Sequence, residues 1–147
     1  MKKTALLALL AGILYSCSGN SSQETGADTA QTQDEAKQLF SRVIAVHDEV
    51  MTYERMILEN RAKLDSIAKL DLPSPVKDSA ILLSKNLTVA ENAMSDWMHK
   101  FEPDYSAKSK GEAIKYLTAE ESKIKKVDTL TKNAIRASWE FYTKYKK

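Results

Sequence analysis

The chain has 147 residues, of which 22 are basic and 20 acidic, and 43% of its residues are hydrophobic. This length suggests one domain with a single core, and 29% charged residues is ordinary for a globular chain. Only four glycines and three prolines are present, which argues against a fold built on many tight turns. Together with long periodic apolar runs, this composition predicts helices.

The N-terminus has the pattern of a bacterial lipoprotein signal. Lys2 and Lys3 precede an apolar stretch over residues 4–14, which is too short to span a membrane and fits a signal peptide. The stretch ends in Leu14-Tyr15-Ser16-Cys17, which resembles a lipobox, and Cys17 is the only cysteine. We therefore expect residues 1–16 to be a signal peptide and Cys17 to be lipidated, with more than one acyl chain for stable anchoring. The alternative is an ordinary cleaved signal followed by an incidental cysteine.

Processing at Cys17 changes the charge balance. Removal of Lys2 and Lys3 leaves 20 basic and 20 acidic residues, so the mature chain lacks the positive charge typical of nucleic-acid-binding proteins. Residues 108–147 nevertheless carry 11 basic and 5 acidic residues. This segment either contacts anionic lipid headgroups or is a solvated helix face.

Residues 18–33 contain no large apolar side chain and are rich in Ser, Thr, Gln and Gly. This composition predicts a flexible tether over residues 17–33, followed by a helical domain over residues 34–147.

Three long helices are expected in that domain. The first covers residues 34–70, the second starts at Ser74-Pro75 and ends before Pro103, and the third runs from a capping-box sequence at Ser109 to the end of the chain. Apolar residues recur every three or four positions in each. The predicted seam positions are Leu39, Val43, Val46, Val50, Tyr53, Ile57, Leu64 and Ile67; Val76, Ala80, Leu83, Leu87, Ala90, Met94, Trp97 and Phe101; and Ala113, Leu117, Ile124, Val127, Leu130, Ala134, Phe141 and Tyr145. The predicted fold is all-α, an antiparallel up-down-up bundle of three long helices with coiled-coil-like packing.

The first helix carries further residues beside its seam, four of them apolar and one a histidine. They are Phe40, Ile44, His47, Met51 and Leu58. They widen the apolar face, so the helix is expected to contact two partner helices at once.

One candidate cofactor site lies on the first two helices. His47 and Met51 share a helix face, as do Met94 and Met98. In an antiparallel pair these four side chains are expected to approach one another. Imidazole and thioether ligands suit copper(I) or the axial positions of a haem. The alternative is that the methionines fill the core and His47 makes an ordinary hydrogen bond.

The remaining polar candidates are weaker. His99 is expected to face solvent. Glu54, Arg61 and Glu120 lie near the seams, where rim salt bridges are expected rather than a carboxylate metal site. No serine-hydrolase, zinc-protease or phosphate-loop motif occurs in the sequence, so no enzymatic activity is expected.

Two segments, His47-Asp48-Glu49-Val50-Met51 and Asp96-Trp97-Met98-His99-Lys100-Phe101, resemble small lipoproteins of Bacteroidota that carry the label "viral A-type inclusion protein". The resemblance implies a helical fold and a cell-envelope location, but no activity. In that family a proline follows the first methionine. Thr52 stands there in this chain, so a straighter first helix is expected.

Two functions follow as hypotheses. The first is a non-enzymatic lipoprotein, anchored to the membrane through Cys17, that binds a protein partner or associates with itself. The second is a small copper- or haem-binding helical-bundle lipoprotein. The residue after Cys17 is Ser18, which does not resemble an inner-membrane retention signal and favours the outer membrane.

Overall fold

A computed structural model describes residues 25–146, and all of its regular structure is helical. The predicted signal peptide and Cys17 lie outside these residues. The helices are α1 (Thr25–Met51), α2 (Glu54–Ala68), α3 (Ser74–Lys100) and α4 (Lys110–Tyr145). No helix within residues 25–146 is both long enough and apolar enough to cross a membrane.

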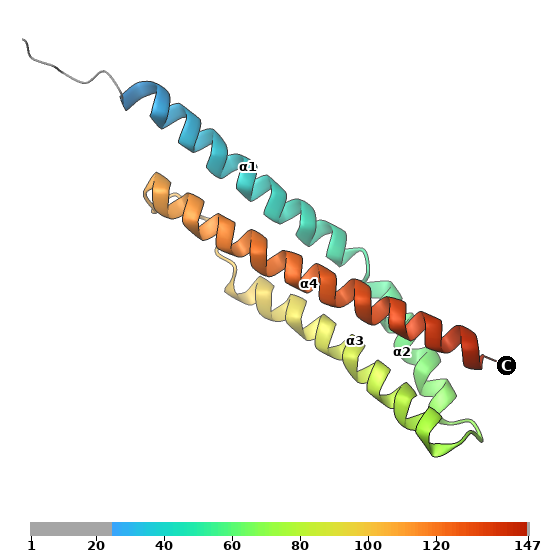
Figure 1. The fold of residues 1–147 in the computed structure, drawn as a ribbon. Coiled ribbons are helices and arrows are strands. Elements are labelled where there is room, and N and C mark those ends of the chain that lie inside the picture. Colours follow the sequence, from blue (N-terminus) through green and yellow to red (C-terminus); the bar gives the residue numbers. More distant parts are fainter. Residues whose placement is uncertain (1–24, 147) are drawn as a thin grey trace, which may run out of the picture.

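The helices form the predicted up-down-up bundle. Figure 1 shows α1 running alongside α4 in the same direction, whereas α3 runs back in the opposite direction. α1 packs mainly on α4, and α2 packs on both α3 and α4. α1 and α2 together therefore form the first arm of a three-arm bundle, with α3 and α4 as the other two.

The prediction of one straight first helix over residues 34–70 is wrong, because the helix is interrupted at Thr52 and Tyr53. The amides of Thr52 and Tyr53 donate to the carbonyls three residues back, at 3.1 and 3.0 Å, which is a tighter pattern than that of an α-helix. The Thr52 hydroxyl also donates to the Glu49 carbonyl at 2.6 Å. A side chain that competes for a helical carbonyl favours a break, so threonine interrupts the helix without any proline.

The start of the first helix was also predicted too late. α1 begins at Thr25, so residues 25–33 are helical and do not belong to a coil as the predicted tether required. Extending an existing helix adds one hydrogen bond per ordered residue, and the costly nucleation step is not repeated. The packed part of α1 therefore supports a polar first segment that sequence composition alone assigned to the tether.

Three clusters of buried side chains fill the bundle along its length. One lies between the middle of α1 and the beginning of α4, a second joins α1, α3 and α4, and a third joins α2, α3 and α4. Their main members are, in that order, Ala36, Leu39, Ala113 and Leu117; Val43, Val50, Met94, Trp97, Ile124 and Val127; and Ile57, Leu64, Ile67, Ala80, Leu87, Ala90 and Ala134. Most predicted seam positions are thus in the core.

One seam position on α4 was predicted wrongly. Leu130 is 38% exposed, whereas the neighbouring Thr131 is completely buried. Asn60 and Ser138 are also buried in this half of the bundle and bond to each other at 2.9 Å, from the amide nitrogen to the hydroxyl oxygen. Polar groups thus replace apolar ones along part of the interface between α2 and α4.

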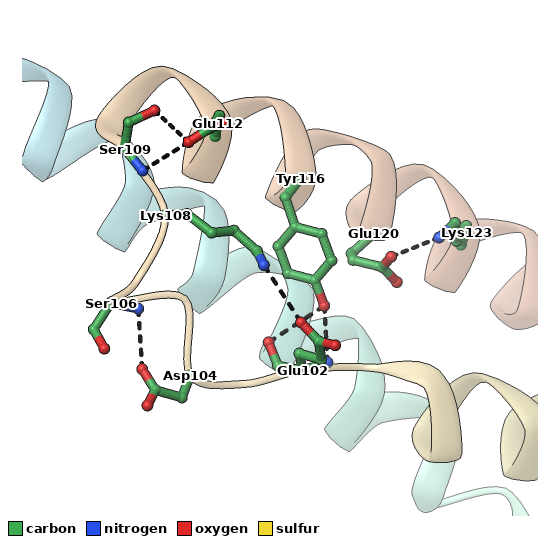
Figure 2. Close-up of polar contacts among 9 residues, drawn as sticks. All are labelled: Glu102, Asp104, Ser106, Lys108, Ser109, Glu112, Tyr116, Glu120 and Lys123. Atoms are coloured by element: carbon green, nitrogen blue, oxygen red, sulfur yellow. Dashed lines mark hydrogen bonds and ion pairs between the residues drawn. The ribbon is translucent and has the colours of Figure 1, made fainter.

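The predicted capping box at the start of α4 is confirmed (Figure 2). The Ser109 backbone and hydroxyl both donate to one carboxylate oxygen of Glu112, at 2.9 and 2.6 Å. The hydrogen bond from the Ser109 hydroxyl, and to a smaller extent that from its backbone, holds the pKa of the Glu112 carboxyl below its usual value of 4.5. Because the folded-state pKa is lowered, the stabilisation is present above pH 4.5 and is lost as the pH falls through the lowered pKa.

We expect the substitution Ser109→Ala to return the Glu112 pKa toward its ordinary value, as followed by carboxyl carbon shifts in an NMR titration. Loss of an N-cap serine also costs about 0.5–2 kcal/mol of stability. Ser122, an exposed serine on α4, is the matched control, and Ser122→Ala should change neither quantity. An unchanged Glu112 titration in the Ser109 variant would show that the cap does not form in solution.

Candidate functional site

A groove lies at the junction of α1, α2 and α3, where the first arm is broken. It has a volume of about 360 Å³ and takes lining residues from all four helices. Three of its lining side chains are the predicted methionines Met51, Met94 and Met98. The structure therefore brings together three members of the site that sequence analysis proposed.

His47, the fourth predicted member, is not among the residues that line this groove. Its ring packs against Trp97 with 5.9 Å between ring centroids, and its Nδ1 lies 2.8 Å from Asp48 Oδ1. His47 precedes Met51 by one helical turn, and α1 directs it toward the second core cluster. The predicted set is thus divided into a methionine groove and a separate histidine–tryptophan contact.

The groove also has polar lining. Glu54, Glu91, Asn92 and Ser95 contribute to its wall, and Thr131 lies on the α4 side. The Thr131 hydroxyl is buried and has no hydrogen-bond partner among the described residues. Thr131 was not predicted from the sequence, because a threonine beside an apolar seam residue is common in helices and does not by itself indicate a site.

Arg61 and Glu120 both form ion pairs as expected, but only that of Arg61 lies at the rim. Arg61 Nη1 lies 2.8 Å from Glu91 Oε2, and both side chains are partly exposed. Glu120, in contrast, is buried, where its carboxylate accepts from the Trp97 indole N–H at 3.0 Å and from Lys123 at 2.6 Å. Figure 2 shows the Lys123 contact. The prediction that Glu120 sits at the rim is therefore wrong, because the indole N–H supplies a partner for a buried carboxylate.

A polar network fastens the break in the first arm to α4. Lys132 Nζ lies 2.8 Å from a Glu49 oxygen and 2.9 Å from an Asp128 oxygen, and the Tyr53 hydroxyl donates to Glu49 at 3.0 Å. Hydrogen bonds from Lys132 and then Tyr53 lower the pKa of Glu49, whereas burial is the first cause that raises the pKa of Tyr53. The break thus has a fixed geometry despite its irregular backbone.

A second groove, of about 510 Å³, lies between α2 and α4 and was not predicted from the sequence. Its lining includes Met56, Lys63, Arg136 and Trp139. The Lys63 ammonium lies 4.9 Å from the Trp139 ring centroid and 5.4 Å from that of Tyr142. Its aromatic wall is therefore already covered by a cation of the chain itself.

The other predicted positions carry no site chemistry. His99 is exposed, as expected, and its Nδ1 lies 2.7 Å from the Ser95 carbonyl oxygen of its own helix. Within residues 25–146, no group of three or more His, Cys, Asp or Glu side chains is placed to hold a metal ion.

Comparison with protein-family models, with curated proteins and with solved structures finds no match to this chain.

Proposed function

We propose that this chain is a lipid-anchored lipoprotein of the cell envelope, located in the outer membrane, whose helical bundle binds another protein without enzymatic activity. The lysine pair, the short apolar stretch and the lone Cys17 support the anchor. Membership of the Bacteroidota lipoprotein family that the two segments resemble is part of the same proposal.

The observation that carries the interaction is a set of large apolar side chains left exposed on α2 and α3. Leu82 and Ile81 are 59% and 58% exposed on α3, Val89 is 46% exposed two turns after Leu82, and Leu58 on α2 is 50% exposed. Fully covering one such side chain contributes about 1.5–3 kcal/mol. Leu82 and Val89 are seven residues apart and so share one face of α3, and contiguous exposed apolar surface is typical of protein-binding sites.

The exposed side chains of α3 and α4 also differ in charge. The basic residues of α4 give its exterior a solvated character, and several pair with carboxylates one turn away, such as Lys125 with Glu121 at 2.7 Å. The exposed positions of α3 named above are apolar instead. α4 also leaves Trp139 and Leu130 exposed, at 47% and 38%, but Ile81 and Leu82 on α3 are more exposed than either. A partner is therefore expected first on α3.

The test is site-specific photo-crosslinking of the full-length lipoprotein in intact cells. A photoreactive amino acid at Leu82 is expected to give a discrete adduct, whereas the same group at the exposed Lys126 of α4 should give none. An adduct of twice the chain mass would identify self-association, and any other discrete mass a different partner. Leu82→Lys should abolish the adduct formed by a photoreactive group at Val89. It should leave the unfolding free energy within about 0.5 kcal/mol, as is usual for surface changes.

Equal labelling at Leu82 and Lys126, or no adduct at either, would reject the interaction. The anchor is tested independently by mass spectrometry of the mature protein, where a Cys17→Ala variant should lack the lipid mass. Loss of the anchor without loss of the crosslink would separate the two parts of the proposal.

The alternative function, a cofactor-binding bundle, is favoured by the methionine groove. Of the two cofactors first considered, haem is less favoured, because His47 does not line the groove and no imidazole ligand is available there. Copper(I) is the cofactor that the three lining methionines favour, because thioether sulfur is a soft ligand.

A further inference from the structure

The methionines of this chain are concentrated at one place. The chain has five methionines, and Met51, Met94 and Met98 line the groove at the break between α1 and α2. Of the other two, Met1 begins the chain and Met56 lines the groove on the other side of α2. Three of the four methionines after Met1 therefore surround a single opening.

These three side chains differ in exposure in a way that suits a ligand site. Met94 is 6% exposed, whereas Met51 and Met98 are 38% and 39% exposed. One lining methionine is thus buried, and the other two are partly accessible to solvent. Filling a core explains Met94, but it does not explain two flexible thioethers left accessible beside it.

The chemistry of such a set is selective. A thioether is a neutral, soft and polarisable ligand that prefers soft cations such as Cu(I) over Mg²⁺, Ca²⁺ or Mn²⁺, which prefer oxygen. Methionine also has three rotatable bonds, so sulfur atoms from two helices can converge on one ion. Glu54 and Glu91 line the same groove; Glu91 is paired with Arg61, so the carboxylate of Glu54 is the one that adds negative charge beside a bound cation.

We propose that this groove is a Cu(I) site in which the thioether sulfurs of Met51, Met94 and Met98 hold the ion. His47 is not a ligand, because its ring packs on Trp97 outside the groove. The site is independent of the exposed α3 positions proposed for protein binding, so each proposal can fail without the other.

The first experiment follows the methionine methyl groups of the full-length chain in detergent by carbon-13 NMR. Ag(I), which has the same charge and filled d shell as Cu(I), is added to avoid oxidation. The methyl signals of Met51, Met94 and Met98 are expected to shift at one equivalent, whereas that of Met56 should not. Shifts confined to Met56, or no shift at all, would overturn the proposal.

The second experiment measures Cu(I) affinity by competition with a chromogenic chelator under anaerobic conditions. Met94→Leu and Met98→Leu preserve apolar volume but remove sulfur. Each should lower the affinity at least about 100-fold, beyond the 10- to 100-fold typical of losing an outer-shell partner. Met56→Leu is the matched control, and it and His47→Gln should leave the affinity unchanged. Unchanged affinity in both groove variants, or a loss in His47→Gln, would reject the thioether site.

Discussion

Trp97→Ala is expected to lower the unfolding free energy by about 3–5 kcal/mol, the usual cost of deleting a buried tryptophan side chain. Trp97 belongs to the cluster that joins α1, α3 and α4. Its ring stacks on Phe101 with 4.7 Å between centroids, and its indole N–H satisfies the buried carboxylate of Glu120. The substitution therefore opens a cavity and leaves a buried charge with fewer partners. Chemical denaturation of the full-length chain measures the change.

Trp97→Phe separates these two effects, because phenylalanine keeps an aromatic ring but has no N–H donor. We expect it to cost about 1–3 kcal/mol, the penalty for an unsatisfied buried acceptor, while Glu120 keeps its contact with Lys123. If Trp97→Phe were as destabilising as Trp97→Ala, the hydrogen bond rather than ring packing would dominate. If it cost nothing, Glu120 would not depend on the indole.

Leu117→Ala and Leu87→Ala are chemically identical changes at two completely buried positions, and each is expected to cost about 2–5 kcal/mol. Their consequences should differ, because Leu117 lies in the cluster between α1 and α4, and Leu87 lies in the cluster of α2, α3 and α4. Leu117→Ala should accelerate amide hydrogen exchange chiefly in α1 and the beginning of α4. Leu87→Ala should accelerate it in α2 and α3. Residue-resolved hydrogen exchange measures this difference.

The outcome that would contradict this division is the same pattern of exchange in both variants. The bundle would then open only as one cooperative unit, and the break at Thr52 and Tyr53 would have no effect on local stability.

The periodicity of the sequence was sufficient to predict the bundle. Buried positions such as Leu39, Leu64 and Leu117 follow the spacing of three and four that places apolar side chains on one helix face. The start of α4 was equally predictable, because a capping box is a local pattern in which Ser109 and Glu112 need only each other.

The predictions that were wrong concern positions whose environment depends on contacts between segments distant in sequence. Glu120 was expected at the rim because a carboxylate is costly to bury. Its burial is possible because Trp97, on another helix, donates a hydrogen bond to the carboxylate. Thr131 rather than Leu130 faces the interior. When two neighbouring positions both lie at the edge of the apolar face, the periodicity of one helix does not show which of them is buried.

The candidate site was predicted in part for the same reason. Pairs one turn apart, such as Met94 and Met98, share a face in any helix, so their grouping was visible in the sequence. The separation of His47 from Met51 was not visible, because it depends on where the groove opens relative to Trp97.

The break at Thr52 and Tyr53 divides the first arm into two helices that are held to the bundle by different contacts. A pull on the N-terminal end acts first on α1, whose packing is mainly against α4. The cluster around Leu64 and Leu87 lies beyond the break and holds α2, α3 and α4 together without α1. We therefore expect a force applied to the N-terminal end to detach α1 from α4 before α2, α3 and α4 separate from one another.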